Sequence, residues 1–149
     1  MSDSAPTTPI ERAKVQRERL AEAADGLERA ITRPSADEAA WRNGAGSALI
    51  EVRAALAAHI DAVESDDGLY ADIMSRSARL AHSIDRLRSE HTKLGDEIDE
   101  LDALLRSADA TVDESNESAL VLLADISRHR HHGANLVWDS YDLDIGEGD

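Results

Sequence analysis

The chain has 149 residues, and its 31 acidic and 16 basic side chains give a formal net charge of −15. It contains no cysteine, which excludes disulfides, thiolate metal sites and thiol nucleophiles. The negative charge argues against binding to nucleic acid or to anionic membrane surfaces, no apolar run approaches the roughly 20 residues that span a bilayer, and the N-terminus lacks a signal-peptide pattern. We therefore expect one cytoplasmic domain, whose partner, if it has one, is another protein or a second copy in a homodimer.

The first predicted helix follows a short polar segment. Residues 1–9 carry little that can be buried, and we expect them to form a disordered tail. The helix is predicted over residues 10–33, with Thr7 or Thr8 as its N-cap and a proline in its first turn. Pro34 ends it, because the residue before a proline avoids the helical conformation. Its inner face carries Ala13, Arg17, Leu20, Ala24, Leu27 and Ile31.

The second predicted helix starts at a capping-box pattern, formed by Ser35 and Glu38. The helix then carries an apolar line that contains one histidine. The residues of that line are Trp41, Ala45, Ala48, Val52, Ala55, His59 and Ala62, flanked by Leu49, Leu56 and Val63.

The third predicted helix has the most regular apolar spacing in the chain, with alternating steps of four and three residues. Its inner face carries Leu80, Ile84, Leu87, His91, Leu94, Ile98, Leu101 and Leu105. A polar connection over residues 107–118 leads to the fourth helix, whose inner face carries Ala119, Leu122, Ile126, His129, Gly133 and Leu136. Residues 143–149 are expected to form an acidic tail. These patterns predict an all-α fold, an antiparallel up-down four-helix bundle over residues 10–142.

Three histidines, His59, His91 and His129, each replace an apolar residue on the inner face of a different helix. In an antiparallel pair, residues equidistant from the turn lie at one level, and His91 and His129 are symmetric about residue 110 in the polar connection. His59 and His91 are symmetric about residue 75, so a turn near Ser75 brings all three rings together. We expect His131 and His132 to lie on a solvated face.

The position of the second turn is therefore decisive. Residues 65–68, Ser-Asp-Asp-Gly, form the stronger local turn signal. A turn there would offset His59 from His91 by about 16 residues, or about 24 Å of helix, and abolish a common site. Leu69, Tyr70 and Ile73 continue the apolar face beyond this segment, which favours the later turn.

Three imidazoles at one level predict a metal site. Neutral imidazole binds zinc, iron and copper, and coordination removes the cost of burying a polar ring. We expect one iron or zinc ion, with His59, His91, His129 and Glu64 as candidate ligands. Other carboxylates that would complete the coordination or orient the rings are Asp61, Glu90 and Asp125. The alternative is a set of core histidines that bond to backbone, water or carboxylates and bind no metal.

Parts of the sequence resemble the hemerythrin-like HHE cation-binding family. Residues 89–94, Ser-Glu-His-Thr-Lys-Leu, are similar to the family's helix with a Glu-His pair, and His59 resembles its second-helix histidine. Residues 122–129 resemble its last helix, and residues 129–146 are similar to the end of a divergent bacterial branch. The resemblance implies a four-helix bundle around a pair of non-haem metal ions, in proteins that carry or sense oxygen or respond to nitric oxide, peroxide or iron.

The chain departs from the family's full set of histidines and bridging carboxylates. The first helix has no histidine, and Val63 and Leu87 occupy two positions where the resemblance implies ligands. Glu64 lies one place beyond the expected carboxylate, and Gly133 stands where the last helix should supply another. These departures favour one metal ion, or none, over a di-iron centre. Gly133 and Ala24 are small inner-face residues, and we expect them to let helices approach closely rather than leave room for a ligand.

Three functions are compatible with the sequence. The first is a hemerythrin-like bundle that binds one transition metal ion in a sensing or storage role. The second is a metal-free interaction or structural module that kept the bundle and lost the chemistry. The third is a redox enzyme with an atypical iron site, which ranks last because the sequence contains no recognisable acid–base set or substrate pocket.

Overall fold

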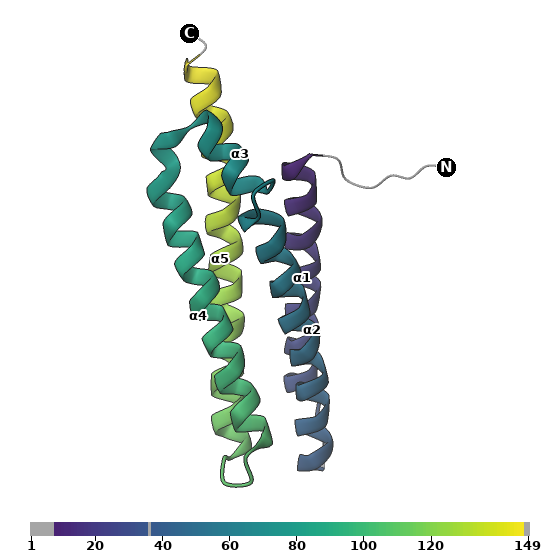
Figure 1. The fold of residues 1–149 in the computed structure, drawn as a ribbon. Coiled ribbons are helices and arrows are strands. Elements are labelled where there is room, and N and C mark those ends of the chain that lie inside the picture. The colour runs from purple at the N-terminus through teal and green to yellow at the C-terminus, as the bar shows by residue number, and fades with distance from the viewer. Residues whose placement is uncertain (1–7, 36, 148–149) are drawn as a thin grey trace, which may run out of the picture.

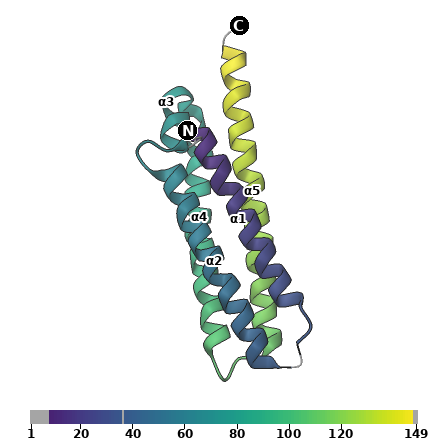
Figure 2. The same ribbon diagram turned by 90° about the vertical axis from the view of Figure 1, so that its right-hand side faces the viewer.

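Four long helices form an antiparallel bundle in the computed structural model, which describes residues 8–35 and 37–147, with residues 142–147 described by their backbone only. The long helices are α1 (Pro9–Thr32), α2 (Glu38–Glu64), α4 (Ala81–Arg106) and α5 (Val112–Glu147). A short helix, α3 (Leu69–Arg76), and a 3₁₀ turn, η1 (Ala78–Leu80), lie between α2 and α4. Figures 1 and 2 show the long helices side by side, with α3 at one end of the bundle. The predicted all-α bundle is confirmed for the described residues.

Capping side chains determine where the first two helices begin. Thr8 caps α1 through a capping box with Glu11, and a proline occupies the first turn, as predicted. The start of α2 differs from the prediction. Asp37, rather than Ser35, is the N-cap, because its carboxylate accepts a backbone N–H from the first turn of the helix. The predicted tail over residues 1–9 lies outside the described residues, apart from its last two.

The last helix is longer than predicted at both ends. The connection expected over residues 107–118 covers only residues 107–111, because α5 begins at Val112. Thr111 and Glu114 form a capping box there, in which the side chain of each accepts the backbone N–H of the other at 2.9 and 3.0 Å. At the other end α5 continues through Glu147, so residues 143–147 of the expected acidic tail are helical.

The connection between α2 and α4 contains both candidate turns. Residues 65–68 end α2, so the predicted continuation of that helix to about Ser75 is wrong. The apolar face beyond Gly68 forms α3, which buries Leu69, Tyr70 and Ile73. The chain reverses direction only after α3, as Figure 1 shows. Since α3 takes up the residues between the two turns, the early break does not offset α2 from α4.

A polar layer divides the core into two apolar clusters. The larger cluster draws on the four long helices and contains Leu20, Leu27, Ile31, Trp41, Ala45, Leu49, Val52, Leu56, Leu94, Ile98, Leu101, Leu105, Ala119, Leu122 and Ile126. The smaller cluster lies around α3 and contains Ala13, Val63, Leu69, Tyr70, Ile73, Leu80, Ile84, Leu87 and Leu136. Between them in chain order stand the three inner-face histidines and, on α1, Arg17.

The inner faces match the predicted ones closely on α4 and less closely on α2. Every residue of the predicted α4 line is buried. On α2 the predicted flanking residues are buried, whereas three alanines of the predicted line are only half-buried. The helix is rotated from the predicted face because burial of larger side chains removes more apolar surface from water. None of the helices in the described part of the chain has an apolar stretch long enough to cross a membrane.

Candidate metal centre

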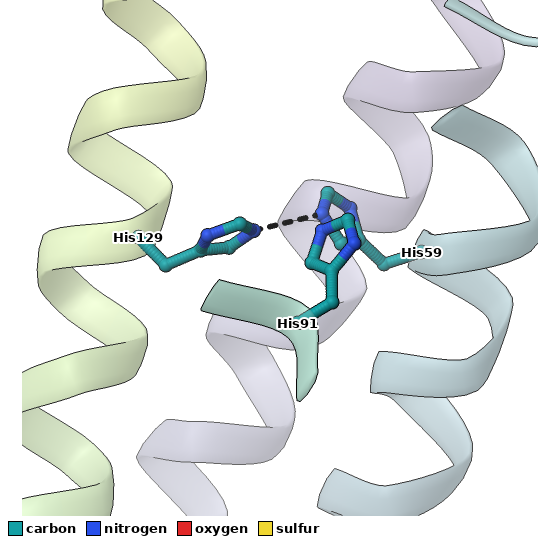
Figure 3. Close-up of side chains that lie close together, drawn as sticks. All are labelled: His59, His91 and His129. Carbon is teal, nitrogen blue, oxygen red and sulfur yellow. Dashed lines mark hydrogen bonds between the residues drawn. The ribbon is translucent and has the colours of Figure 1, made fainter. Parts of the chain in front are cut away.

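The three predicted histidines come together in the core. His59 on α2, His91 on α4 and His129 on α5 are 7, 4 and 3% exposed. One ring nitrogen of each lies within 4.8 Å of the others, which makes these three residues a group that could hold a metal ion. Figure 3 shows the three rings pointing toward one another from their separate helices.

The levels of the histidines follow from the connections. The loop at residues 107–111 is centred near residue 110, so the predicted symmetry of His91 and His129 is confirmed. His59 reaches the same level because α3 separates the break after α2 from the reversal before α4. The ring centroids are 4.7 to 5.3 Å apart, and the rings are packed edge to face.

Two carboxylates bond to the outer ring nitrogens. Glu64 bonds to Nδ1 of His91 through Oε2. Glu90 accepts a hydrogen bond from Nδ1 of His129 at 2.7 Å and, through its other oxygen, from Nδ1 of His132 at 2.7 Å. A carboxylate only accepts hydrogen bonds, so the proton of His91 and of His129 resides on Nδ1. The Nε2 lone pairs of these two rings are therefore free for another partner.

The Nε2 atoms have few partners inside the cluster. Nε2 of His59 lies 3.2 Å from Nε2 of His129, as the dashed line in Figure 3 shows. His59 donates this hydrogen bond, because His129 carries its own proton on Nδ1. Nε2 of His91 and Nδ1 of His59 are buried and have no hydrogen-bond partner. Unpaired buried nitrogens destabilise a core, and a metal ion would satisfy the one on His91.

The rings are neutral at neutral pH. Burial, with the nearby charges of His91 and His129, lowers the pKa of His59 from 6.5 to about 3. Burial also lowers the pKa of His91 to about 3, and it lowers the pKa of His129 despite the hydrogen bond to Glu90. Only neutral imidazole binds a metal. Burial of these polar rings destabilises the core, but it also keeps the rings neutral and therefore able to coordinate an ion.

The spacing of the nitrogens is close to that of a coordination sphere. Zinc–nitrogen bonds of 2.0–2.1 Å in a tetrahedron place two ligand nitrogens about 3.3 Å apart. Nε2 of His59 and Nε2 of His129 are 3.2 Å apart, so this pair already has the required separation. The remaining distances, up to 4.8 Å, would have to shorten for all three nitrogens to coordinate one ion.

A small cavity adjoins His59 and His129. Its volume is about 20 Å³, enough for one water-sized group. Gly133 lies along its wall, and a Cβ added there would meet nothing within 4 Å. The expectation that Gly133 lets helices approach closely is therefore wrong, because the space beside it is open. Tyr70 closes another side and stacks on His91 with the rings 9° from parallel.

Other predicted carboxylates do not join the group of three. Asp61 is exposed. Asp125 lies near His129, but it pairs with Lys93 and Arg128 rather than with a histidine. Glu64, a predicted ligand, contacts the outer nitrogen of His91 and is not in the group of three.

Two residues of the site were not recognised from the sequence. His132 was expected on a solvated face, but it is half-buried and bonds to Glu90. The signal was its spacing, because residues three apart share a helix face and His132 follows His129 by three. Tyr70 was assigned to the apolar face, without any link to the histidines.

Comparisons of the chain with protein-family models, with curated proteins and with solved structures gave no match. The structure itself defines the class of protein, an antiparallel helical bundle with a buried cluster of three histidines. The resemblance to hemerythrin-like proteins stays a hypothesis.

Proposed function

We propose that this protein binds one transition metal ion, zinc or iron, through Nε2 of His91 and His129 and one ring nitrogen of His59, in a sensing or storage role. The observation that carries the proposal is the pair of carboxylates on the outer nitrogens. Glu64 and Glu90 hold two of the three rings with Nδ1 protonated, which leaves Nε2 as the coordinating atom. Metal-bound histidines commonly donate their other N–H to a carboxylate in this way.

Charge balance supports a divalent ion. The three neutral imidazoles contribute no charge, and Glu64 and Glu90 contribute two negative charges directly behind the rings. Burial alone would raise the pKa of Glu90, but hydrogen bonds from His129 and His132 outweigh burial and hold that pKa below its usual range. Glu90 therefore stays ionised. Glu64 orients His91 in this proposal, since direct coordination by Glu64 would break that contact.

The origin of the ligands supports a sensing role. The three rings belong to α2, α4 and α5, and their nitrogens lie as much as 4.8 Å apart before an ion draws them together. Binding of the ion therefore changes how the three helices pack against one another. A partner protein can detect that change in packing. A hemerythrin-like origin fits the bundle, and the small ligand set fits one ion better than a bridged pair.

A metal-free interaction module is the second candidate. The hydrogen bond between His59 and His129 satisfies two ring nitrogens without an ion. Trp138 and Tyr141 are 72% and 51% exposed near the end of α5, and exposed aromatic residues are common at protein interfaces.

Elemental analysis tests the choice. Protein expressed without a histidine tag, with iron and zinc supplied, should contain about one metal ion per chain. His91→Ala should lose it. His82→Ala is the matched control, since His82 is exposed on the same helix, and it should retain the ion. Less than about a tenth of an ion per chain in the unaltered protein would overturn the metal proposal in favour of the interaction module.

A further inference from the structure

Two arginines line the small cavity beside the histidines. Arg17 on α1 and Arg130 on α5 share its wall with His59 and His129. Arg17 occupies the position on the inner face of α1 between Ala13 and Leu20, so it is the contribution of that helix to the polar layer. Its charge also acts on His59, where it adds to the effect of burial and helps to lower the pKa of that ring.

Neither arginine has an acidic partner within the described part of the chain. Nε of Arg130 is buried without a hydrogen-bond partner. Elsewhere in this acidic protein arginines do pair, as Arg42 does with Glu38 and Arg53 with Asp99. Two like charges around one cavity repel each other, and partial burial strengthens the repulsion. A bound anion would relieve this repulsion, and no acidic side chain among the described residues pairs with either arginine.

The carboxylates of the metal centre do not supply it either. Glu64 and Glu90 bond to His91, His129 and His132, and together they balance a divalent ion. With that ion bound, the charges of both arginines remain uncompensated. The open space at Gly133 lies next to them, and its 20 Å³ accepts a single oxygen atom.

We propose that this cavity is a binding site for a small oxyanion, held by Arg17 and Arg130, and that the oxyanion and the metal ion bind cooperatively. The proposal rests on the proposed function, because the second ligand is the metal ion in the histidine cluster. Carboxylate-type and sulfate-type anions share the relevant chemistry: one oxygen enters the cavity, and the others accept hydrogen bonds from guanidinium groups. Binding coupling is reciprocal, so the anion must raise the affinity for metal.

The test is a cobalt(II) titration of the full chain, followed by absorption, in perchlorate and then in formate or sulfate at the same ionic strength. Formate and sulfate distinguish a planar from a tetrahedral anion, and perchlorate coordinates weakly. The unaltered protein should bind cobalt about tenfold more tightly in formate or in sulfate than in perchlorate. Arg130→Gln should reduce this enhancement to less than about twofold. Its affinity for cobalt in perchlorate should be no weaker than that of the unaltered protein, because one positive charge that repels the ion is removed.

Two further variants separate the anion site from general effects. Gly133→Ala fills the cavity and favours the helix, so it should abolish the enhancement in a stably folded protein. Arg53→Gln removes a charge from the helix that carries His59 but lies outside the cavity, and it should keep the enhancement. Equal cobalt affinity in all three salts would overturn the oxyanion site alone. Failure to bind cobalt in any salt would overturn the proposed function and this inference with it.

Discussion

Glu90 holds two histidine rings at once, through one carboxylate oxygen each. This shared contact fixes the proton of His129 on Nδ1 and ties the ring to His132 one turn further along α5. From the sequence, Glu90 was expected beside His91, its neighbour in the chain. Consecutive side chains on a helix point about 100° apart, so Glu90 faces α5 while His91 faces the core. A single sequence identifies the histidines of the cluster through their spacing, but a carboxylate partner depends on which helix lies opposite.

Glu90→Gln tests this role at the residue scale. A glutamine has one acceptor oxygen and an amide group that donates, so it cannot accept a hydrogen bond from both rings. Zinc affinity, measured by competition with a chelating dye, should fall about 10–100-fold. Glu100→Gln is the control, because Glu100 is exposed on the same helix. Equal affinities for the two variants would show that Glu90 does not position the ligands.

The low pKa of His59 predicts a pH dependence of stability. In the unfolded chain His59 takes up a proton below pH 6.5, whereas in the folded protein its pKa is about 3. Folding therefore excludes a proton between these values, and the free energy of unfolding falls as the pH drops from 6.5 toward 3. The ring contributes up to about 1.4 kcal/mol per pH unit in this window.

Urea denaturation of the metal-free protein at pH 7.5, 6 and 5 measures this contribution. His59→Gln lacks the titrating group, so its stability should fall less steeply than that of the unaltered protein. The comparison also removes the general effect of the acidic surface, which both proteins share. If the free energy of unfolding falls equally with pH in both proteins, the result contradicts the lowered pKa of His59.

At the scale of elements, the break after α2 is the feature that places α3. Gly68 has an extended backbone there, with φ of −87° and ψ of −177°. A Cβ added at Gly68 would lie 2.8 Å from the carbonyl oxygen of Ala62 and 3.0 Å from that of Ser65. The close approach of backbone, rather than the backbone angles, therefore requires glycine at this turn.

Gly68→Ala should lower the free energy of unfolding by about 1–3 kcal/mol, because backbone atoms must move to admit the methyl group. Gly95→Ala is the matched variant inside α4, where an added Cβ meets nothing within 4 Å. It should raise stability by up to about 1 kcal/mol through helix propensity. Chemical denaturation gives both values. If the two substitutions change the free energy of unfolding equally, glycine is not specifically required at this turn.

The elements also show what the apolar pattern can predict. The leucine and isoleucine spacing of α4 identified every buried position, since only one face of that helix is apolar. The alanine-rich α2 has apolar residues on several faces, so the pattern left its rotation open. Neither of the two candidate turns alone describes the connection between α2 and α4. Local turn chemistry ends α2 at residues 65–68, whereas tertiary packing determines where the chain reverses direction.

At the scale of the whole molecule, the fold could be predicted from the sequence, whereas the surroundings of the histidine cluster could be predicted only in part. Four amphipathic stretches with short connections have few arrangements other than an antiparallel bundle, and symmetry about residue 110 placed two histidines at one level. The open space at Gly133 was not predictable, since a glycine on an inner face fits both close packing and a cavity. Only the position of the neighbouring helices decides between them.

We expect the polar layer between the two apolar clusters to divide the bundle into two cooperative units. The smaller unit contains α3 and the adjoining ends of the long helices, and it has fewer buried apolar residues than the larger one. Opening the smaller unit alone needs less free energy than complete unfolding. Backbone amides of α3 and of the start of α4 should therefore exchange with deuterium faster than those around Ile98, a buried residue of the larger unit.

A metal ion bonded to three helices would join the two units. Zinc should therefore slow exchange in the smaller unit toward the rate of the larger one, because the ion binds only where both are folded. Hydrogen–deuterium exchange with and without zinc measures this effect. Uniform protection along α4 in the metal-free protein would show instead that the bundle opens as one unit. If the two units do differ, the metal-free bundle opens most easily at the histidine layer, and a bound ion closes the bundle at that same layer.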